Sequence, residues 1–287
     1  MNIFAIDIGG TFVKYGVWNE GKLKETNKFK TPDTWDGLTK KCKEILATFQ
    51  ESYSIEGVAV SAPGAVDAQT GLIGGISAVS YIHEVEFQKE LESILELPVK
   101  IENDANCAAL AESWLGVAKG FECVLFVVLG TGVGGAIINQ GKINHGANLY
   151  GGEFGLMVLD QGKTFSDFTI SNIARQFSEG KDQDYSGEDI FHLAEKLEDK
   201  EAQDTIEKYC HYTSLGIYNL LVSYNPDRIV IGGGISDKEG FISELSMRVQ
   251  LKLAQHGVSQ IHNDIVACYF RNDANLIGAV SMFMDVK

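Results

Sequence analysis

The chain has 287 residues, of which 45% are hydrophobic, and a formal net charge of −15 at pH 7. A chain of this length can bury one large core or two modest ones, and length favours two lobes. No run of lysine or arginine exceeds two residues, which excludes a nucleic-acid surface, since phosphate backbones are bound by basic stripes. No apolar run approaches the roughly twenty residues of a membrane span. Five dispersed cysteines without a Cys-x-x-Cys pair predict reduced thiols and a cytoplasmic protein.

The first element is a predicted hairpin with an acid beside its turn. Ile3 to Ile6 are typical of a buried strand, Gly9-Gly10 predict the turn, and Phe12 to Trp18 predict the returning strand. Glycines let backbone N–H groups approach an anion closely, so Asp7 and this turn are candidates for holding phosphates. The alternative is an ordinary tight hairpin in which Asp7 is satisfied by local contacts.

Helices and strands then alternate along the chain. In the first half we expect helices over 36–52, 87–95 and 105–115, with strands over 57–60 and 99–102. In the second half we expect a hairpin over 125–138, helices over 171–177, 189–196 and 202–224, and a strand over 228–231.

The hairpin over 125–138 repeats the pattern of the first one. Its glycines satisfy a dinucleotide fingerprint, but a strand follows them where that fingerprint requires a helix, and no Walker loop is present. The sequence therefore predicts two similar α/β lobes with mixed sheets and a central cleft. The expected smaller N-terminal lobe spans 1–118, the larger C-terminal lobe spans 119–273, and a helix over about 274–287 packs back on the first.

Six motifs in order carry a resemblance to a known family: Asp7-Ile-Gly-Gly-Thr-Phe-Val-Lys14, Ser61-Ala-Pro-Gly64, Glu102-Asn-Asp-Ala-Asn106, Leu129-Gly-Thr-Gly-Val-Gly-Gly135, Gly151-Gly-Glu-Phe-Gly155 and Ile231-Gly-Gly-Gly-Ile235. Each is weak alone, but together they span nearly the whole chain. The chain resembles the ROK family of sugar kinases and sugar-responsive repressors. The resemblance implies the actin and hexokinase type of fold, a duplicated ribonuclease-H-like core.

The resemblance also implies roles for the matched residues. Asp104 would be the general base that takes the proton of a sugar hydroxyl, and Asp7 would help to place Mg²⁺, indirectly. The implied ATP-binding residues are Asp7, Gly9, Gly10, Thr11, Lys14, Gly130, Thr131, Gly132, Gly233 and Gly234. The implied sugar-binding residues are Gly64, Asn103, Asp104 and Glu153.

Some of these residues also have a structural interpretation. Asp104 could merely cap the helix that follows it, because Asp is favoured there. Glu153 could be a solvated loop acid. The histidines, His83 and His145 among them, are interpreted as surface or core residues rather than ligands.

One part of the family pattern is missing. Leu156 stands where many family kinases have His, and no Cys-x-Cys-Gly loop follows, so we expect no structural zinc. Asp167, four residues before Ser171, is a candidate replacement for a sugar-binding Glu, with a helix-start acid as the alternative.

The missing zinc loop favours a roomier site near the first carbon of the sugar and hence a β-glucoside such as cellobiose as the substrate. Glucose, N-acetylmannosamine or fructose is the alternative substrate, and a non-catalytic sugar sensor is the alternative of another class. A repressor is disfavoured, because the first strand starts at Ile3 and leaves no room for a DNA-binding domain. Family members are commonly dimers, so a homodimer is expected.

Overall fold

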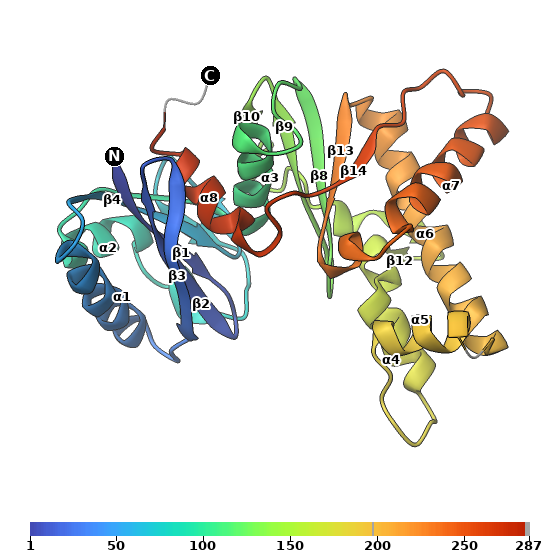
Figure 1. The fold of residues 1–287 in the computed structure, drawn as a ribbon, viewed down its shortest axis with the longest axis horizontal. Helices are drawn as coiled ribbons and strands as arrows, with labels where there is room; N and C mark the ends of the chain where they lie inside the picture. The colour runs from blue at the N-terminus through green and yellow to red at the C-terminus, as the bar shows by residue number, and fades with distance from the viewer. Residues whose placement is uncertain (197, 285–287) are drawn as a thin grey trace. The chain divides into compact units, whose positions relative to one another are not determined.

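The computed structural model describes residues 1–196 and 198–284. These residues form two compact units, and Figure 1 shows their helices and strands coloured by residue number. Of the described residues, the first unit comprises 1–120, 141–151 and 269–284, and the second comprises 121–140, 152–196 and 198–268. The segment 141–151 thus belongs to the first unit, outside the expected range 1–118. Residues 285–287 of the expected last helix lie outside the described residues.

The first unit is built on a mixed sheet of order β3-β2-β1-β4-β7. β1 pairs antiparallel with β2, which confirms the predicted hairpin, and it pairs parallel with β4. On its other side, β4 pairs parallel with β7. The strands are β1 (Asn2–Ile8), β2 (Phe12–Asn19), β3 (Lys22–Lys30), β4 (Ile55–Ala62) and β7 (Val99–Asn103), and a separate small hairpin joins β5 (Ala65–Asp67) to β6 (Leu72–Gly74).

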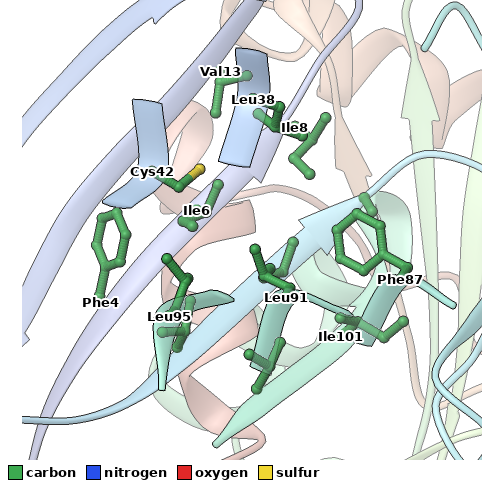
Figure 2. Close-up of a cluster of buried hydrophobic side chains, with 14 of the residues drawn as sticks. Phe4, Ile6, Ile8, Val13, Leu38, Cys42, Phe87, Leu91, Leu95 and Ile101 are labelled. Carbon is green, nitrogen blue, oxygen red and sulfur yellow. The ribbon is translucent and has the colours of Figure 1, made fainter. Parts of the chain in front are cut away.

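The strands of the first sheet direct alternate side chains to its two faces, and helices pack on both faces. Phe4, Ile6 and Ile8 of β1 enter the core that the first two helices cover, as Figure 2 shows. Asp7 points the other way, toward the last helix, which contacts β1 and β4. The helices are α1 (Trp35–Gln50), α2 (Phe87–Leu95), α3 (Asp104–Leu115) and α8 (Ala274–Ser281), with 3₁₀ turns η1 (Ser80–His83) and η5 (Arg271–Asp273).

The second unit repeats this strand arrangement. Within it the sheet order is β9-β8-β13-β14, with β8 antiparallel to β9 and parallel to β13, and β13 parallel to β14. This order matches β2-β1-β4-β7 of the first unit, so the predicted duplication is confirmed. The strands are β8 (Cys123–Leu129), β9 (Val133–Asn139), β13 (Arg228–Gly232) and β14 (Ile265–Ala267); the short β10 (Lys142–Ile143) falls in the segment assigned to the first unit.

Four helices accompany the second sheet: α4 (Ile170–Ser178), α5 (Gly187–Lys196), α6 (Lys200–Tyr224) and α7 (Phe241–Gln255). Between β9 and α4 lie η2 (Phe154–Leu156), η3 (Phe165–Phe168) and the short hairpin of β11 (Val158–Asp160) with β12 (Lys163–Thr164), and η4 (Gly234–Asp237) follows β13. Among the residues described, no helix has the length and apolar character needed to cross a membrane.

Candidate active site

Asp7 is a buried carboxylate whose orientation is fixed on three sides. It lies opposite Ser61 in the β1–β4 ladder and opposite Lys14 in the β1–β2 ladder. Oδ1 accepts hydrogen bonds from Ser61 Oγ at 2.8 Å and from Asn275 Nδ2 at 3.0 Å. The Lys14 ammonium lies 3.9 Å from Oδ2 and donates to the Asn272 carbonyl at 3.3 Å. Among the residues that the structure describes, Oδ1 thus accepts two hydrogen bonds and Oδ2 accepts none.

The turn after β1 requires glycine for steric reasons. The Gly9 N–H donates to the Phe12 carbonyl at 3.1 Å, and a Cβ at Gly9 would lie 2.9 Å from that same oxygen. A Cβ at Gly10 would lie 2.8 Å from Ala78 Cβ. Thr31 Oγ1 donates to the Gly9 carbonyl at 2.5 Å and anchors the turn. Because the Gly9 amide is used within the hairpin, the amides of Gly10 and Thr11 are the ones in this turn that remain for an anionic ligand.

Asp104 is the first residue of α3, and Asn103 is the N-cap. Asn103 Oδ1 accepts from the N–H groups of Ala105 at 2.9 Å and Asn106 at 3.2 Å, which is the usual capping pattern. Asp104 Oδ1 accepts from the Ala105 N–H at 2.8 Å. The helix therefore has its cap without Asp104, and the capping interpretation of Asp104 loses its main support. Asp104 still lies where the helix dipole stabilises a carboxylate.

Asn103 also connects the start of α3 to Gly64, the residue before β5, by a hydrogen bond. Its Nδ2 donates to the Gly64 carbonyl at 3.0 Å, so one amide N–H remains for another acceptor. Gly64 has φ +107°, and a Cβ there would lie 2.8 Å from the Gly74 carbonyl oxygen. Any other residue here would have a strained backbone conformation, and its Cβ would collide with that oxygen, so glycine is required.

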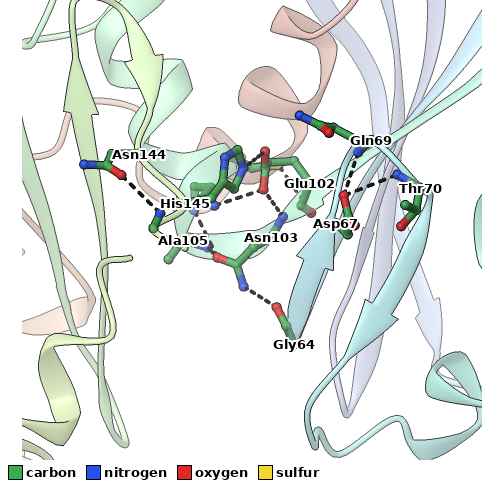
Figure 3. Close-up of polar contacts among 12 residues, drawn as sticks. Gly64, Asp67, Gln69, Thr70, Glu102, Asn103, Ala105, Asn144 and His145 are labelled. Carbon is green, nitrogen blue, oxygen red and sulfur yellow. Dashed lines mark hydrogen bonds and ion pairs between the residues drawn. The ribbon is translucent and has the colours of Figure 1, made fainter. Parts of the chain in front are cut away.

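The buried carboxylate of Glu102 holds the start of α3 in place through hydrogen bonds, as Figure 3 shows. Oε1 accepts from the Asn103 N–H at 2.8 Å and from Asn106 Nδ2 at 2.9 Å. Oε2 lies 2.8 Å from Nε2 of His145, a contact that raises the pKa of the imidazole. The Glu102–His145 pair thus fixes the backbone that carries Asp104.

The second glycine hairpin opens onto a pocket in the second unit. Its turn is closed by the Gly130 N–H, which donates to the Gly132 carbonyl at 3.0 Å. Thr169 Oγ1 donates to the Thr131 carbonyl at 3.0 Å. The pocket has a volume of about 900 Å³ and is called the α5 pocket here. Its lining includes Leu129, Gly130, Thr131, Ile170, Gly187, Phe191, Gly234 and Ile235.

Gly233 and Gly234 follow β13 and differ in their surroundings. Gly233 has φ +91°, and a Cβ there would lie 2.2 Å from the Leu129 carbonyl oxygen. The turn after β13 therefore packs closely against the end of β8 at Leu129. Gly234 begins η4 and lines the α5 pocket, and a Cβ there would have no neighbour within 4 Å.

The remaining predicted residues lie on the segment between β9 and α4. Glu153 is exposed and directly precedes η2. Leu156 is 63% exposed, and its side chain has no atom that can bind a metal. Asp167 forms a capping box with Thr164, whose N–H and hydroxyl donate to Oδ2 at 2.7 and 2.9 Å, and these bonds lower the pKa of Asp167. Asp167 therefore has the helix-start role of the alternative interpretation, and a sugar contact stays a prediction.

Several site residues were missed in the sequence. The sequence motifs include Ser61 without giving it a role and do not include Asn275, although both donate a hydrogen bond to Asp7. Phe191 and Gly187 of α5 line the α5 pocket without any motif of their own. A signal existed only for Ser61, because its place at the end of a parallel strand beside β1 puts it next to Asp7.

Comparisons with known proteins agree with this geometry. The sequence model of the ROK family matches residues 3–286. The β-glucoside kinases of Listeria monocytogenes and Klebsiella pneumoniae are 34% and 35% identical to the chain, cover 99% of it in each case, and are themselves covered over 98% and 96%. The crystal structure of a ROK family protein from Streptococcus pneumoniae in complex with sucrose superposes with a TM-score of 0.90 at 32% identity, covering 99% of this chain and 98% of that one.

The duplicated sheet, with a glycine hairpin in each copy, is the actin and hexokinase type of fold, as predicted. The chain belongs to the ROK family. It is a sugar kinase, which confirms the predicted enzyme class.

Proposed function

We propose that this chain transfers the γ-phosphoryl group of ATP to the hydroxymethyl group of a β-glucoside such as cellobiose. The observation that carries the proposal is the position of Asp104 as the first residue of a helix whose cap is supplied by Asn103. The choice of β-glucoside is supported by two relatives of that name that align over nearly their whole length. Exposed Leu156, in place of a zinc-binding His, also supports a roomier site.

Asp104 is the proposed general base. At the start of α3 its carboxylate is stabilised by the helix dipole, which makes it a weak base. A weak base suffices, because the hydroxyl becomes acidic only as its oxygen bonds to phosphorus. Asn103 has one amide N–H left for a sugar hydroxyl, and Glu153 and Asp167 are proposed as further sugar contacts.

Mg²⁺ fits the surroundings of Asp7. The ion prefers oxygen ligands and keeps several waters beside one or two carboxylates and the phosphates of the substrate. Asp7 Oδ1 already accepts two hydrogen bonds, so Oδ2 is the oxygen that can face the ion or one of its waters. Lys14, 3.9 Å from Oδ2, adds a positive charge for the phosphates. When bound, Mg²⁺ neutralises the charge that develops on the transferring group.

The two glycine turns are the proposed phosphate contacts. The amides of Gly10 and Thr11 serve in the first unit, and the turn Gly130–Gly132 serves in the second. The α5 pocket is the proposed nucleoside site, because about 900 Å³ lies in the range of small-molecule sites and Phe191 offers an aromatic face. We further propose a cytoplasmic homodimer without structural zinc.

The test is ADP release from ATP and Mg²⁺ with cellobiose, glucose, N-acetylmannosamine and fructose as acceptors. Strong turnover of cellobiose with weak turnover of the monosaccharides supports the proposal. The reverse preference makes the chain a hexose kinase. Sugar binding without ADP release from any of the four overturns the catalytic role and supports a sensor.

A further inference from the structure

A second hollow lies in the first unit, apart from the α5 pocket. It has a volume of about 680 Å³ and is bounded by the turn that follows β5 and by the segment 143–149. We call it the Asp67–His145 hollow. Its polar lining consists of Asp67, Gln69, Asn144, His145 and Asn148. Carboxylate, amide and imidazole groups are suited to sugar hydroxyls, which both donate and accept hydrogen bonds.

The loops that form the Asp67–His145 hollow are held in shape by their own hydrogen bonds. Asp67 Oδ1 accepts from the N–H groups of Gln69 at 2.9 Å and Thr70 at 3.2 Å. Hydrogen bonds from Thr70 are the main reason that the pKa of Asp67 is lowered, so the carboxylate is charged at neutral pH. On the other wall, Asn144 Oδ1 accepts from the Gly146 N–H at 3.1 Å, which leaves the amide nitrogen of Asn144 for other partners. The hollow therefore offers preformed polar groups.

His145 is anchored on one side and has a second nitrogen available. Its Nε2 is bonded to the buried Glu102 carboxylate at 2.8 Å, so Nε2 carries a proton there. Nδ1 has no hydrogen-bond partner among the residues that the structure describes, and it is the remaining polar atom of the ring. A ring fixed by a buried acid loses little freedom when it binds a ligand.

Two short connections link the Asp67–His145 hollow to the proposed sugar residues. The Glu102 carboxylate that holds His145 also accepts from the Asn103 N–H at 2.8 Å. The Asn103 amide in turn holds the Gly64 carbonyl at 3.0 Å, three residues before Asp67. Figure 3 shows these groups side by side in the first unit. These hydrogen bonds connect the walls of the hollow to Asn103 within this unit.

We propose that the Asp67–His145 hollow binds the second sugar ring of a β-linked glucosyl disaccharide while Asn103 and Asp104 hold the ring that is phosphorylated. This inference rests on the proposed β-glucoside function. The volume is within the range of sites for small molecules. A monosaccharide has no second ring and leaves the hollow to water, so residues here should affect disaccharides selectively.

The test compares two substrates in two variants. Gln69→Ala and Asn148→Ala each remove an exposed amide from the hollow and touch none of the residues proposed for catalysis. We expect kcat/KM for cellobiose to fall about fivefold to tenfold in each, the scale of one hydrogen bond, while kcat/KM for glucose stays unchanged. Gln50→Ala is the matched control, because Gln50 is an exposed amide at the end of α1 in the same unit. It should alter neither value.

The outcomes separate this inference from the proposed function. If the unmodified chain turns over cellobiose but neither variant changes the cellobiose-to-glucose ratio, the hollow is not the subsite and the β-glucoside function stands. An equal loss for both substrates likewise overturns the subsite and leaves the function standing. If the unmodified chain phosphorylates glucose and not cellobiose, the proposed function fails and the inference fails with it.

Discussion

Replacing Asp104 with Asn tests whether this residue acts in chemistry or only in the helix. The substitution keeps the side-chain shape, and Asn can still accept from the Ala105 N–H, which Asp104 Oδ1 now does at 2.8 Å. The N-cap of α3 is Asn103, so both capping hydrogen bonds are retained. The change therefore removes one negative charge near a helix N-terminus, which costs about 0.3–1 kcal/mol of stability.

The effect on turnover should be much larger than the effect on stability. A positioned general base contributes about 100-fold or more to the rate, which corresponds to about 2.7 kcal/mol in the activation barrier. Asn cannot accept the proton. We expect kcat of Asp104→Asn to fall at least about 100-fold, with the KM for the sugar changed by less than about threefold, since the amide still bonds a hydroxyl.

The assay is steady-state ADP release with thermal unfolding measured on the same samples. Thr34→Ala is the control for a lost helix cap, because Thr34 Oγ1 caps α1 by accepting from the Gly37 N–H at 3.2 Å, far along the chain from Asp104. It should cost about 1 kcal/mol of stability and leave kcat unchanged. A folded Asp104→Asn protein with nearly normal kcat would refute the base assignment, and so would a fall in kcat only as large as that in Thr34→Ala.

Four other substitutions probe local contacts. Gly233→Ala should cost at least about 2 kcal/mol of unfolding free energy, because Gly233 has φ +91° and the added Cβ would lie 2.2 Å from the Leu129 carbonyl oxygen. Gly234→Ala should cost under about 1 kcal/mol, because its Cβ would have no neighbour within 4 Å. Equal losses of the two variants in chemical denaturation would contradict this. The Glu102 contact raises the pKa of His145, so the stability that this contact adds to the folded chain is complete below about pH 6.5 and is lost as pH rises through the raised pKa. The melting temperature of His145→Gln should therefore vary less with pH than that of the parent chain. Parallel pH profiles of the two proteins would show that the contact does not contribute in this way. Asp7→Asn should lower kcat at least about tenfold and raise the Mg²⁺ concentration needed for half-maximal rate, and an unchanged Mg²⁺ titration would remove Asp7 from the metal site.

Local patterns predicted most of the individual elements. The helix over 87–95 matches α2 at both ends, since its apolar residues Phe87, Leu91 and Leu95 recur at helical spacing and are all buried. The glycine hairpins were predicted for a similar reason, because a buried apolar strand followed by glycines permits few other structures. The third strand, β3, was not predicted, since its burial pattern is mostly exposed and its sequence is rich in lysine.

The site was predictable only where one motif held all of its parts. Asp104 was placed correctly at a helix start, but the identity of the cap could not be decided, because Asn and Asp are both favoured there. The partners of Asp7 come from β4 and from α8, 54 and 268 residues away. Contacts at such separations depend on the packing of the whole unit, which no local period encodes.

The two copies of the repeated strand arrangement differ at equivalent positions. In both hairpins a three-residue turn joins an apolar strand to its antiparallel partner, over 9–11 in the first unit and 130–132 in the second. In each unit a parallel strand pairs with the penultimate residue of the first hairpin strand. Ser61 of β4 lies opposite Asp7 of β1, and Gly232 of β13 lies opposite Val128 of β8. The acid and its hydroxyl partner in the first copy are therefore replaced by an apolar side chain and a glycine in the second. The carboxylate that we propose to face Mg²⁺ therefore belongs to the first unit. The second turn, which has no acid at this position, lies beside a pocket of a size that suits a nucleoside.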